Sequence, residues 1–273
     1  MRRCSDVRAP LVLAGMSLAM LALALALAGC GGSGLSDSSS SAASASAAGI
    51  WTGTDSSSGL SLTGIVNSAG VADFIRSDGV QYVGSVQVAG DTLAATLDGY
   101  TQFGSQFSDG SISGVGTLNA TVSTNSSISG TLSFTTSGNT ASSSTWTLTF
   151  DTLYNSSSSL SAISGNYTDA TTNDPANGTT VSISGSGAIS AQNASSGCVL
   201  NGQVTVQNAS YDIYQVTYSY ASCSGADATL NGIEFTGLAL LNTDVSPTQL
   251  VMGVSGKDST GNGYGIVSGL TAG

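Results

Sequence analysis

The sequence predicts an all-β protein built as one or two small antiparallel meander barrels, and two patterns support this fold class. Apolar and polar residues alternate, as in Trp146, Leu148 and Phe150, which are separated by threonines. A period of two is typical of strands with one buried face and one wet face. Clusters of Gly, Asn, Ser and Asp separate these runs, as turns between strands require. After Cys30 the sequence contains no segment with the 3.6-residue period of an amphipathic helix.

A triplet of one apolar residue, one polar residue and glycine recurs along the chain. Glycine inside a strand weakens it, so its repeated use on the inward-facing parity predicts sharply coiled strands whose backbones approach closely. A closed barrel is therefore favoured over a sandwich, and general glycine richness is the alternative explanation for the triplets. They are Leu62-Thr63-Gly64, Ile112-Ser113-Gly114, Ile128-Ser129-Gly130, Ile163-Ser164-Gly165, Ile183-Ser184-Gly185, Leu200-Asn201-Gly202 and Phe235-Thr236-Gly237.

Composition divides the chain into five segments. Residues 1–29 have the pattern of an export signal, and residues 30–48 form a Ser/Gly/Ala-rich tether with nothing to bury. Residues 49–154 and 162–273 are two halves with similar openings, joined by the Ser-rich linker 155–161. Each half has room for about eight short strands, enough for a small barrel filled by side chains. One continuous fold is the alternative to two domains.

The first thirty residues begin with three arginines, and an uncharged apolar run from Leu11 to Ala28 follows. This order of a basic start, an apolar middle and a small-residue end is typical of export signals. An apolar run of this length could also just cross a bilayer as an uncleaved helix. The placement of Cys30 directly after small residues favours a cleaved signal.

The residues Leu27-Ala28-Gly29-Cys30 resemble the lipobox of bacterial lipoproteins at all four positions. In that family the cysteine thiol is diacylglycerylated, the signal is cleaved before it, and the new amino terminus is acylated. The resemblance implies that Cys30 is the lipid-bearing first residue of the mature chain. Gly31 follows where inner-membrane retention signals of the family usually carry Asp, which implies the outer membrane of a Gram-negative cell envelope. Two or three acyl chains anchor a protein firmly, whereas one binds reversibly.

The charge balance excludes several classes of partner. The chain has five basic and sixteen acidic residues, no histidine and a net charge of −11. Clustered Lys and Arg are needed to bind nucleic acid phosphates or anionic lipid, so neither is an expected partner of the protein surface. Cleavage before Cys30 would leave Arg76 and Lys257 as the remaining basic residues. We predict no enzymatic activity, no catalytic residue, no cofactor and no metal.

Gly49-Ile50-Trp51, at the start of the first half, resembles the first-strand signature of lipocalins and their calycin relatives. Those barrels often carry Arg or Lys on a late strand, and residues 144–154 contain neither. The whole arrangement of lipobox, tether and Gly-rich barrels is similar to surface lipoproteins such as factor H-binding protein and transferrin-binding protein B. These resemblances imply a membrane-anchored protein with a binding or structural role, whose partner is a protein or a small apolar ligand. A carrier of a small apolar ligand inside a calycin-like barrel is the alternative.

Two cysteines, Cys198 and Cys223, remain in the second half and are expected to form a disulfide. Cys198 begins one predicted strand and Cys223 ends the next, so an antiparallel hairpin would place them side by side. Disulfides persist in the compartments outside the cytosol to which an export signal leads. A pair of reactive thiols is the alternative, but no cationic neighbour is visible that would lower a thiol pKa.

The segment from Asp169 to Gly178 is rich in oxygen ligands, which Ca²⁺ prefers. Its spacing does not match an EF-hand loop, and its Asp-Pro and Asn-Gly pairs are common turn formers, so a turn is favoured over a calcium site. The other aspartates lie at strand ends, and they indicate no pair of carboxylates suited to a hydrolase.

Four tyrosines cluster near one predicted strand of the second half. They could form an exposed recognition surface, or they could fill and surround a barrel. Filling is favoured because the strand alternates. The four are Tyr211, Tyr214, Tyr218 and Tyr220.

Overall fold

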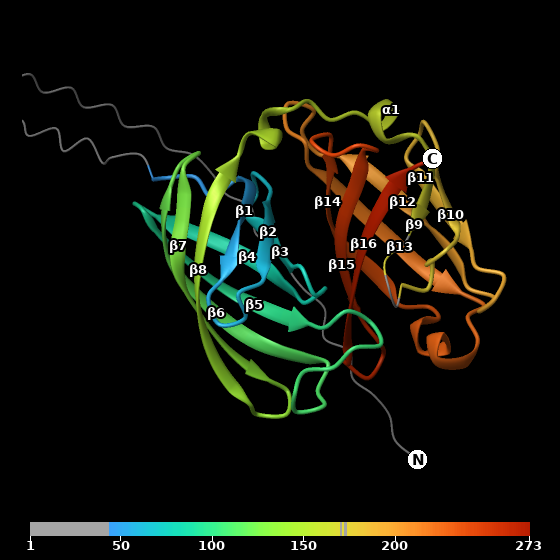
Figure 1. Ribbon diagram of the computed structural model, residues 1–273, viewed down its shortest axis with the longest axis horizontal. Coiled ribbons are helices and arrows are strands. Elements are labelled where there is room, and N and C mark those ends of the chain that lie inside the picture. Colours follow the sequence, from blue (N-terminus) through green and yellow to red (C-terminus); the bar gives the residue numbers. More distant parts are fainter. Residues whose placement is uncertain (1–43, 170, 172–173) are drawn as a thin grey trace, which may run out of the picture. The chain divides into compact units, whose positions relative to one another are not determined.

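The computed structural model describes residues 44–169, 171 and 174–273, which belong to one compact unit. Each half of this part closes into an eight-stranded antiparallel barrel (Figure 1). The prediction of an all-β fold with small meander barrels is therefore confirmed. The predicted signal, Cys30 and the tether up to residue 43 lie outside the described residues. Among the described residues, no helix has the length and apolar character that crossing a membrane requires.

Barrel 1 is an up-and-down meander in which each strand pairs with the next, and its last strand returns to the first. The closing pair, β1 and β8, is in register from Ile50–Asp151 to Asp55–Trp146. The strands are β1 (Gly49–Asp55), β2 (Ser61–Val66), β3 (Val71–Arg76), β4 (Gln81–Ala89), β5 (Thr92–Tyr100), β6 (Ser113–Ser123), β7 (Ser127–Thr136) and β8 (Ala141–Asp151).

The interior of barrel 1 is filled by the inward parity of its strands. Trp51 and Trp146 are both fully buried there, and Leu148 lies in the same cluster. Phe74 packs beside Trp146 with ring centroids 5.1 Å apart. The alternation that predicts β8 therefore places apolar residues inside and threonines outside, because successive strand residues point to opposite faces.

The chain between the barrels forms two short helical turns. These are the 3₁₀ turn η1 (Thr152–Asn155) and the one-turn helix α1 (Leu160–Ile163). Side chains cap both turns: Asp151 accepts a hydrogen bond from the Leu153 N–H, and Ser159 accepts one from the Ala162 N–H. Such caps satisfy backbone donors that a helix start leaves free.

Barrel 2 repeats the meander and closes between its first and last strands. It also contains the 3₁₀ turn η2 (Gly225–Leu230). The strands are β9 (Gly165–Asp169), β10 (Thr180–Ile183), β11 (Ala188–Gln192), β12 (Val199–Val206), β13 (Tyr214–Ala221), β14 (Glu234–Asn242), β15 (Gln249–Lys257) and β16 (Gly263–Ala272).

Tyrosines fill much of barrel 2. Tyr214, Tyr218 and Tyr220 are buried inside it, which confirms the prediction that they fill the barrel. Tyr211 instead stacks on Tyr154 outside the barrel, with ring centroids 4.3 Å apart.

The glycine triplets mark close approaches of neighbouring strands, as predicted. A methyl group added to Gly237 would lie 1.9 Å from the Gly253 carbonyl oxygen, and one on Gly202 would lie 2.2 Å from that of Thr217. Neither position accepts a side chain without a shift of backbone. Gly165 and Gly185 are different, because no atom lies within 4 Å of the group added at either position.

Residues 44–48 are packed on the end of barrel 1, so the predicted tether is too long at its C-terminal end. The Ala45 N–H donates to the Gly90 carbonyl at 2.7 Å. Ala47 is 4% exposed, and its carbonyl accepts a hydrogen bond from the Trp51 indole at 2.9 Å. Small residues suit both a spacer and a tight contact, so composition alone did not distinguish them.

Barrel 2 closes through a short seam. β15 and β16 pair at nine positions, whereas β9 and β16 pair at three. Much of one edge of β16 therefore lacks a neighbouring strand, and an open edge exposes unpaired N–H and C=O groups.

A loop of barrel 1 covers this open edge. The Val267 N–H donates to Gln102 Oε1 at 2.8 Å, and Gln102 Nε2 donates to the Val267 carbonyl at 3.4 Å. The next N–H, of Phe103, donates to the Gly265 carbonyl at 2.9 Å. The Gln102 amide thus takes the place of a peptide group in a neighbouring strand, and one barrel completes the wall of the other.

We predict that Gln102→Glu at neutral pH lowers the free energy of unfolding by about 1–3 kcal/mol, because the carboxylate cannot donate to Val267 and leaves buried groups unpaired. Urea unfolding measures the loss, and hydrogen exchange should become faster at the Val267 amide. Gln106→Glu, an exposed change in the same loop, is the control. Equal stability of the two variants would show that the seam does not depend on Gln102.

Candidate functional site

The barrels join through outward-facing apolar residues. Ile50, Ile65 and Ile75 point away from the interior of barrel 1 and pack in one cluster with Leu238 and Leu240 of β14. Ile65 is fully buried. These strands are thus buried on both faces. Apolar residues on both parities, as in Ile50 beside Trp51, are the sequence signal that could have identified the contact.

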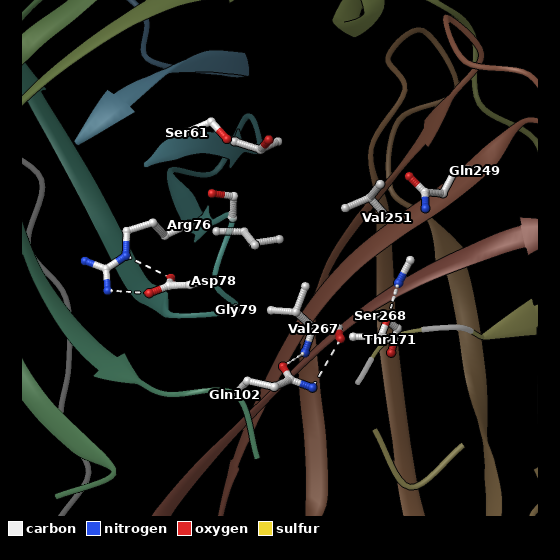
Figure 2. Close-up of a pocket in the computed structure, with 14 residues that line it drawn as sticks. Ser61, Arg76, Asp78, Gly79, Gln102, Thr171, Gln249, Val251, Val267 and Ser268 are labelled. Carbon is white, nitrogen blue, oxygen red and sulfur yellow. Dashed lines mark hydrogen bonds and ion pairs between the residues drawn. The ribbon is translucent and has the colours of Figure 1, made fainter. Parts of the chain in front are cut away.

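A cleft of about 470 Å³ remains between the barrels beside this cluster (Figure 2). Its floor is apolar, formed by Ile75, Val251 and Val267, and its rims carry hydroxyl and amide groups. The polar lining residues are Ser61, Thr63, Arg76, Ser77, Asp78, Gln102, Thr171, Gln249 and Ser268.

Arg76 stands at the end of β3 on the barrel 1 side of the cleft. Its Nε and Nη2 donate to the two Asp78 carboxylate oxygens at 2.9 and 2.8 Å. Nη1 lies 3.4 Å from Asp55 Oδ2. Such a two-point pair fixes the guanidinium and neutralises its charge. The cleft therefore presents a polar rim with little net charge.

Asp55 of β1 connects this end of barrel 1 to Ser144 of β8 and to Arg76 of β3. Burial raises its pKa, but hydrogen bonds from Ser144 and Ser57 outweigh that effect and lower the pKa to about 2. The Ser144 hydroxyl donates to Asp55 Oδ1 at 2.5 Å. The carboxylate is thus ionised at neutral pH, and it helps to hold Arg76 at the rim.

A second gap between the barrels, of about 230 Å³, is lined by Asp73 on β3 and by Gln207 and Thr236 of barrel 2. Asp73 is 1% exposed, and neither of its carboxyl oxygens makes a hydrogen bond within the described residues. Burial raises the pKa of Asp73 to about 8, so the carboxyl is neutral at pH 7. The expectation that Asp73 lies at a strand end with other turn-forming aspartates is wrong, because Asp73 lies within β3.

The two cations of the described part lie where the barrels approach each other. Arg76 lines the cleft. Lys257 of barrel 2 donates to Asp98 Oδ2 of barrel 1 at 3.0 Å. Half-exposed ion pairs contribute little stability, so this contact orients the barrels more than it stabilises them.

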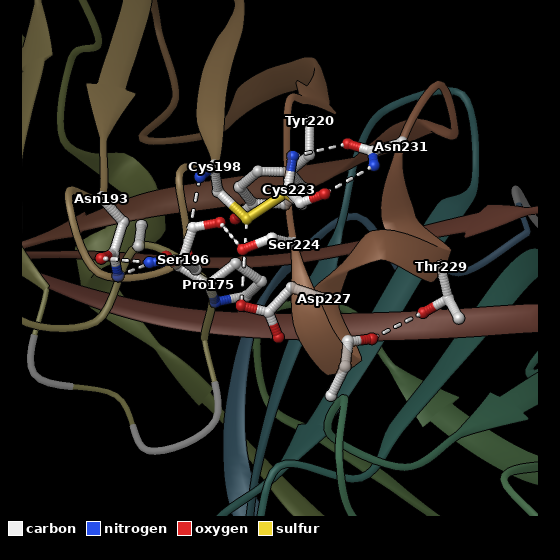
Figure 3. The surroundings of a disulfide bond; sticks show 12 residues. Pro175, Asn193, Ser196, Cys198, Tyr220, Cys223, Ser224, Asp227, Thr229 and Asn231 are labelled. Atoms are coloured by element: carbon white, nitrogen blue, oxygen red, sulfur yellow. Dashed lines mark hydrogen bonds between the residues drawn. A yellow bond between two sulfur atoms is a disulfide. The ribbon is translucent and has the colours of Figure 1, made fainter.

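Cys198 and Cys223 form the expected disulfide, just before β12 and just after β13 (Figure 3). Asn231 accepts a hydrogen bond from the Cys223 N–H at 2.8 Å and returns one to its carbonyl at 3.0 Å. The disulfide thus closes the end of a hairpin and lies away from the cleft lining.

The described residues 174–178 of the oxygen-rich segment form a turn, as predicted. The Asn177 N–H donates to the Asp174 carbonyl at 2.8 Å, and the Gly178 N–H donates to the Asp169 carbonyl at 2.8 Å. The segment also places Thr171 in the lining of the cleft.

Comparison with known proteins gives no relative: no family model, no curated protein and no solved structure matches the chain. The function of the cleft therefore has to be inferred from its own residues.

We predict that the stability of the folded body falls as pH rises from about 4 to about 8. Burial raises the pKa of Asp73 to about 8 and, against a hydrogen bond from the Leu241 N–H, that of Asp212 to about 7. A raised carboxyl pKa stabilises the folded state fully below the unfolded value near 4, and the contribution is lost as pH rises to the folded value.

Asp73→Asn should therefore reduce the pH dependence of the unfolding free energy by about 1.4 kcal/mol per pH unit in this interval. Urea unfolding at several pH values between about 5 and about 8 measures the slope of the unfolding free energy against pH. Asp244→Asn, at an exposed turn, is the control. Equal slopes for the wild type and Asp73→Asn would contradict the burial argument.

Proposed function

We propose that the chain is a non-enzymatic lipoprotein of the bacterial cell envelope, anchored through acylated Cys30, that binds a polar, weakly charged ligand in the cleft between its barrels. The observation that carries the anchor is Cys30, placed after an apolar run and the small residues Ala28 and Gly29. The Cys198–Cys223 disulfide supports export, because disulfides persist in oxidising compartments.

The chain enters barrel 1 at the end opposite to the cleft. Ser46 donates to Thr124 Oγ1 at 2.9 Å, so the chain joins the body at the β6–β7 turn. The cleft residues Ser61 and Arg76 lie at the opposite ends of their strands, since Ser61 pairs with Thr54 near the end of β1. The entry of the chain therefore leaves the cleft unobstructed.

The lining of the cleft supports binding. Ser61, Thr63 and Ser77 offer hydroxyl groups, and Gln249 offers an amide, around an apolar floor. Arg76 is already paired with Asp78, so an additional full charge on the ligand would find little compensation. Sugars and peptide backbones present matching hydroxyl, amide and apolar groups. We assign no reaction to the cleft.

The alternative, a carrier of a small apolar ligand inside one barrel, gains no support from the packing. Both interiors are occupied by buried side chains, including Trp51 and Trp146 in barrel 1 and Tyr214 and Phe235 in barrel 2. The cavities between the barrels are lined by outward-facing residues instead. Native mass spectrometry of the folded body tests the carrier, since a bound ligand would add a fixed mass.

We predict that cells expressing the chain incorporate labelled palmitate into it and that Cys30→Ala abolishes the label, because the thiol that receives the lipid is gone. Globomycin, which blocks the lipoprotein signal peptidase, should cause the precursor to accumulate. Cys4→Ala, a cysteine with no lipobox before it, is the control. Labelling that persists in Cys30→Ala would refute the anchor.

We predict that a photo-crosslinking amino acid at Ser77, on the rim of the cleft, captures an envelope component in cells, whereas the same group at exposed Ser143 on β8 does not. Gln249→Trp, which fills the cleft, should abolish the adduct without changing the melting temperature. Mass spectrometry of the adduct identifies the ligand class. Equal capture at both positions, or capture that Gln249→Trp leaves unchanged, would locate binding elsewhere.

A further inference from the structure

Two buried carboxyl groups meet inside the end of barrel 2. Asp169 is the last residue of β9, and Asp174 lies in the turn segment that follows. They are 0% and 4% exposed. Asp169 pairs with Leu270 of β16, two residues from Ser268, whose hydroxyl donates to Asp174, so the two carboxyl groups lie near the same stretch of β16. Two carboxylate oxygens repel unless something positive lies between them.

Two hydroxyl groups and one backbone N–H donate hydrogen bonds to this pair of carboxyl groups. The Tyr220 hydroxyl donates to Asp174 Oδ1 at 3.1 Å, and the Ser268 hydroxyl donates to Asp174 Oδ2. The Thr171 N–H donates to Asp169 Oδ1 at 2.8 Å. Basic side chains do not contribute, because the two in the described part pair elsewhere, with Asp55, Asp78 and Asp98.

Two buried oxygens at this place lack partners. Asp169 Oδ2 and the Tyr218 hydroxyl make no hydrogen bond within the described residues. Tyr218 is 2% exposed, and its ring lies 5.4 Å from that of Tyr220. Leaving a buried polar oxygen unpaired is costly, so each of these oxygens favours a bound partner.

We propose that Asp169 and Asp174, with the hydroxyls of Ser268 and Tyr220, form a calcium-binding site in the wall of barrel 2. The set is made only of oxygen, which is the donor chemistry that Ca²⁺ prefers. The ion would place positive charge between the two carboxylates and coordinate the free Asp169 Oδ2. It would reach them through the cleft between the barrels, because Thr171 and Ser268 line that cleft.

The site would be one of low affinity. The described residues hold no group of three or more His, Cys, Asp or Glu suited to a metal, so two carboxylates supply the formal charge. Calcium sites with few charged ligands bind with a Kd of about 10⁻⁴–10⁻³ M. Bound calcium would join β9, β13 and β16, which places it beside the short seam of the barrel. The proposal is independent of the lipid anchor and of the ligand in the cleft.

The test uses the full chain, purified in detergent and freed of metal with EDTA. Tb³⁺ bound beside Tyr220 should emit on excitation of tyrosine, and added Ca²⁺ should quench this emission by displacement. Calcium chloride at about 10 mM should raise the melting temperature by about 3–6 °C over the metal-free protein, with a smaller rise in magnesium chloride.

Asp169→Asn and Asp174→Asn should each abolish the calcium-displaceable emission and the calcium-dependent shift in melting temperature. Asp212→Asn, a change at another buried carboxyl of barrel 2, should retain both. Ser268→Ala keeps both carboxyls and should weaken calcium binding several-fold even if an Asp variant fails to fold. A wild type that shows neither displaceable emission nor a calcium-dependent shift would overturn the proposal and leave a shared proton between the carboxyls. Unchanged calcium binding by Asp169→Asn would do the same.

Discussion

The pairing of the Gln102 side chain with the backbone of Val267 is the contact on which the described architecture depends. An eight-stranded barrel is stable when every strand edge is paired, and β9 is too short to pair with the whole of β16. The loop after β5 supplies the missing peptide-like group from the other barrel. Barrel 2 is therefore not a self-sufficient module attached by a linker, because part of its wall belongs to its neighbour. Gln102 and Val267 also line the cleft, beside the apolar cluster through which the barrels join.

Because the two barrels join by their outer faces, the residues on those faces need to be apolar at the junction. The junction contains such residues in Ile50, Ile65 and Ile75, and burying their apolar side chains favours association of the barrels. The junction also buries two polar residues, Asp73 and Gln81, whose side-chain polar atoms lack partners within the described residues. An unpaired buried polar group opposes association. The junction thus combines a favourable apolar cluster with an unfavourable polar one, and the protonated state of Asp73 limits the cost.

The sequence predicts those features of the structure that depend on residues close together in the chain. The alternation around Trp146 and Leu148 was enough to predict barrel strands, and the positions of Cys198 and Cys223 were enough to predict their bond. The cleft and the Gln102 contact were beyond such reasoning, because they join residues more than 150 positions apart and depend on how two closed sheets meet. Period-two patterns assume one buried face, so they could not indicate that outward residues such as Asp73 are buried. The predicted lipid site at Cys30 concerns residues outside the described part and stays a prediction.

The scarcity of basic residues makes the folded part of the chain a poor substrate for proteases that cut after Arg or Lys. Proteases of the trypsin type cut after Arg or Lys, and residues 44–273 offer them Arg76 and Lys257. Arg76 is held by two carboxylates at a strand end, and Lys257 closes β15 with its amine on Asp98. Cleavage needs a segment that can open locally, and paired strands seldom do so. A body with these two sites would resist trypsin-type proteases better than a Lys-rich protein with exposed sites.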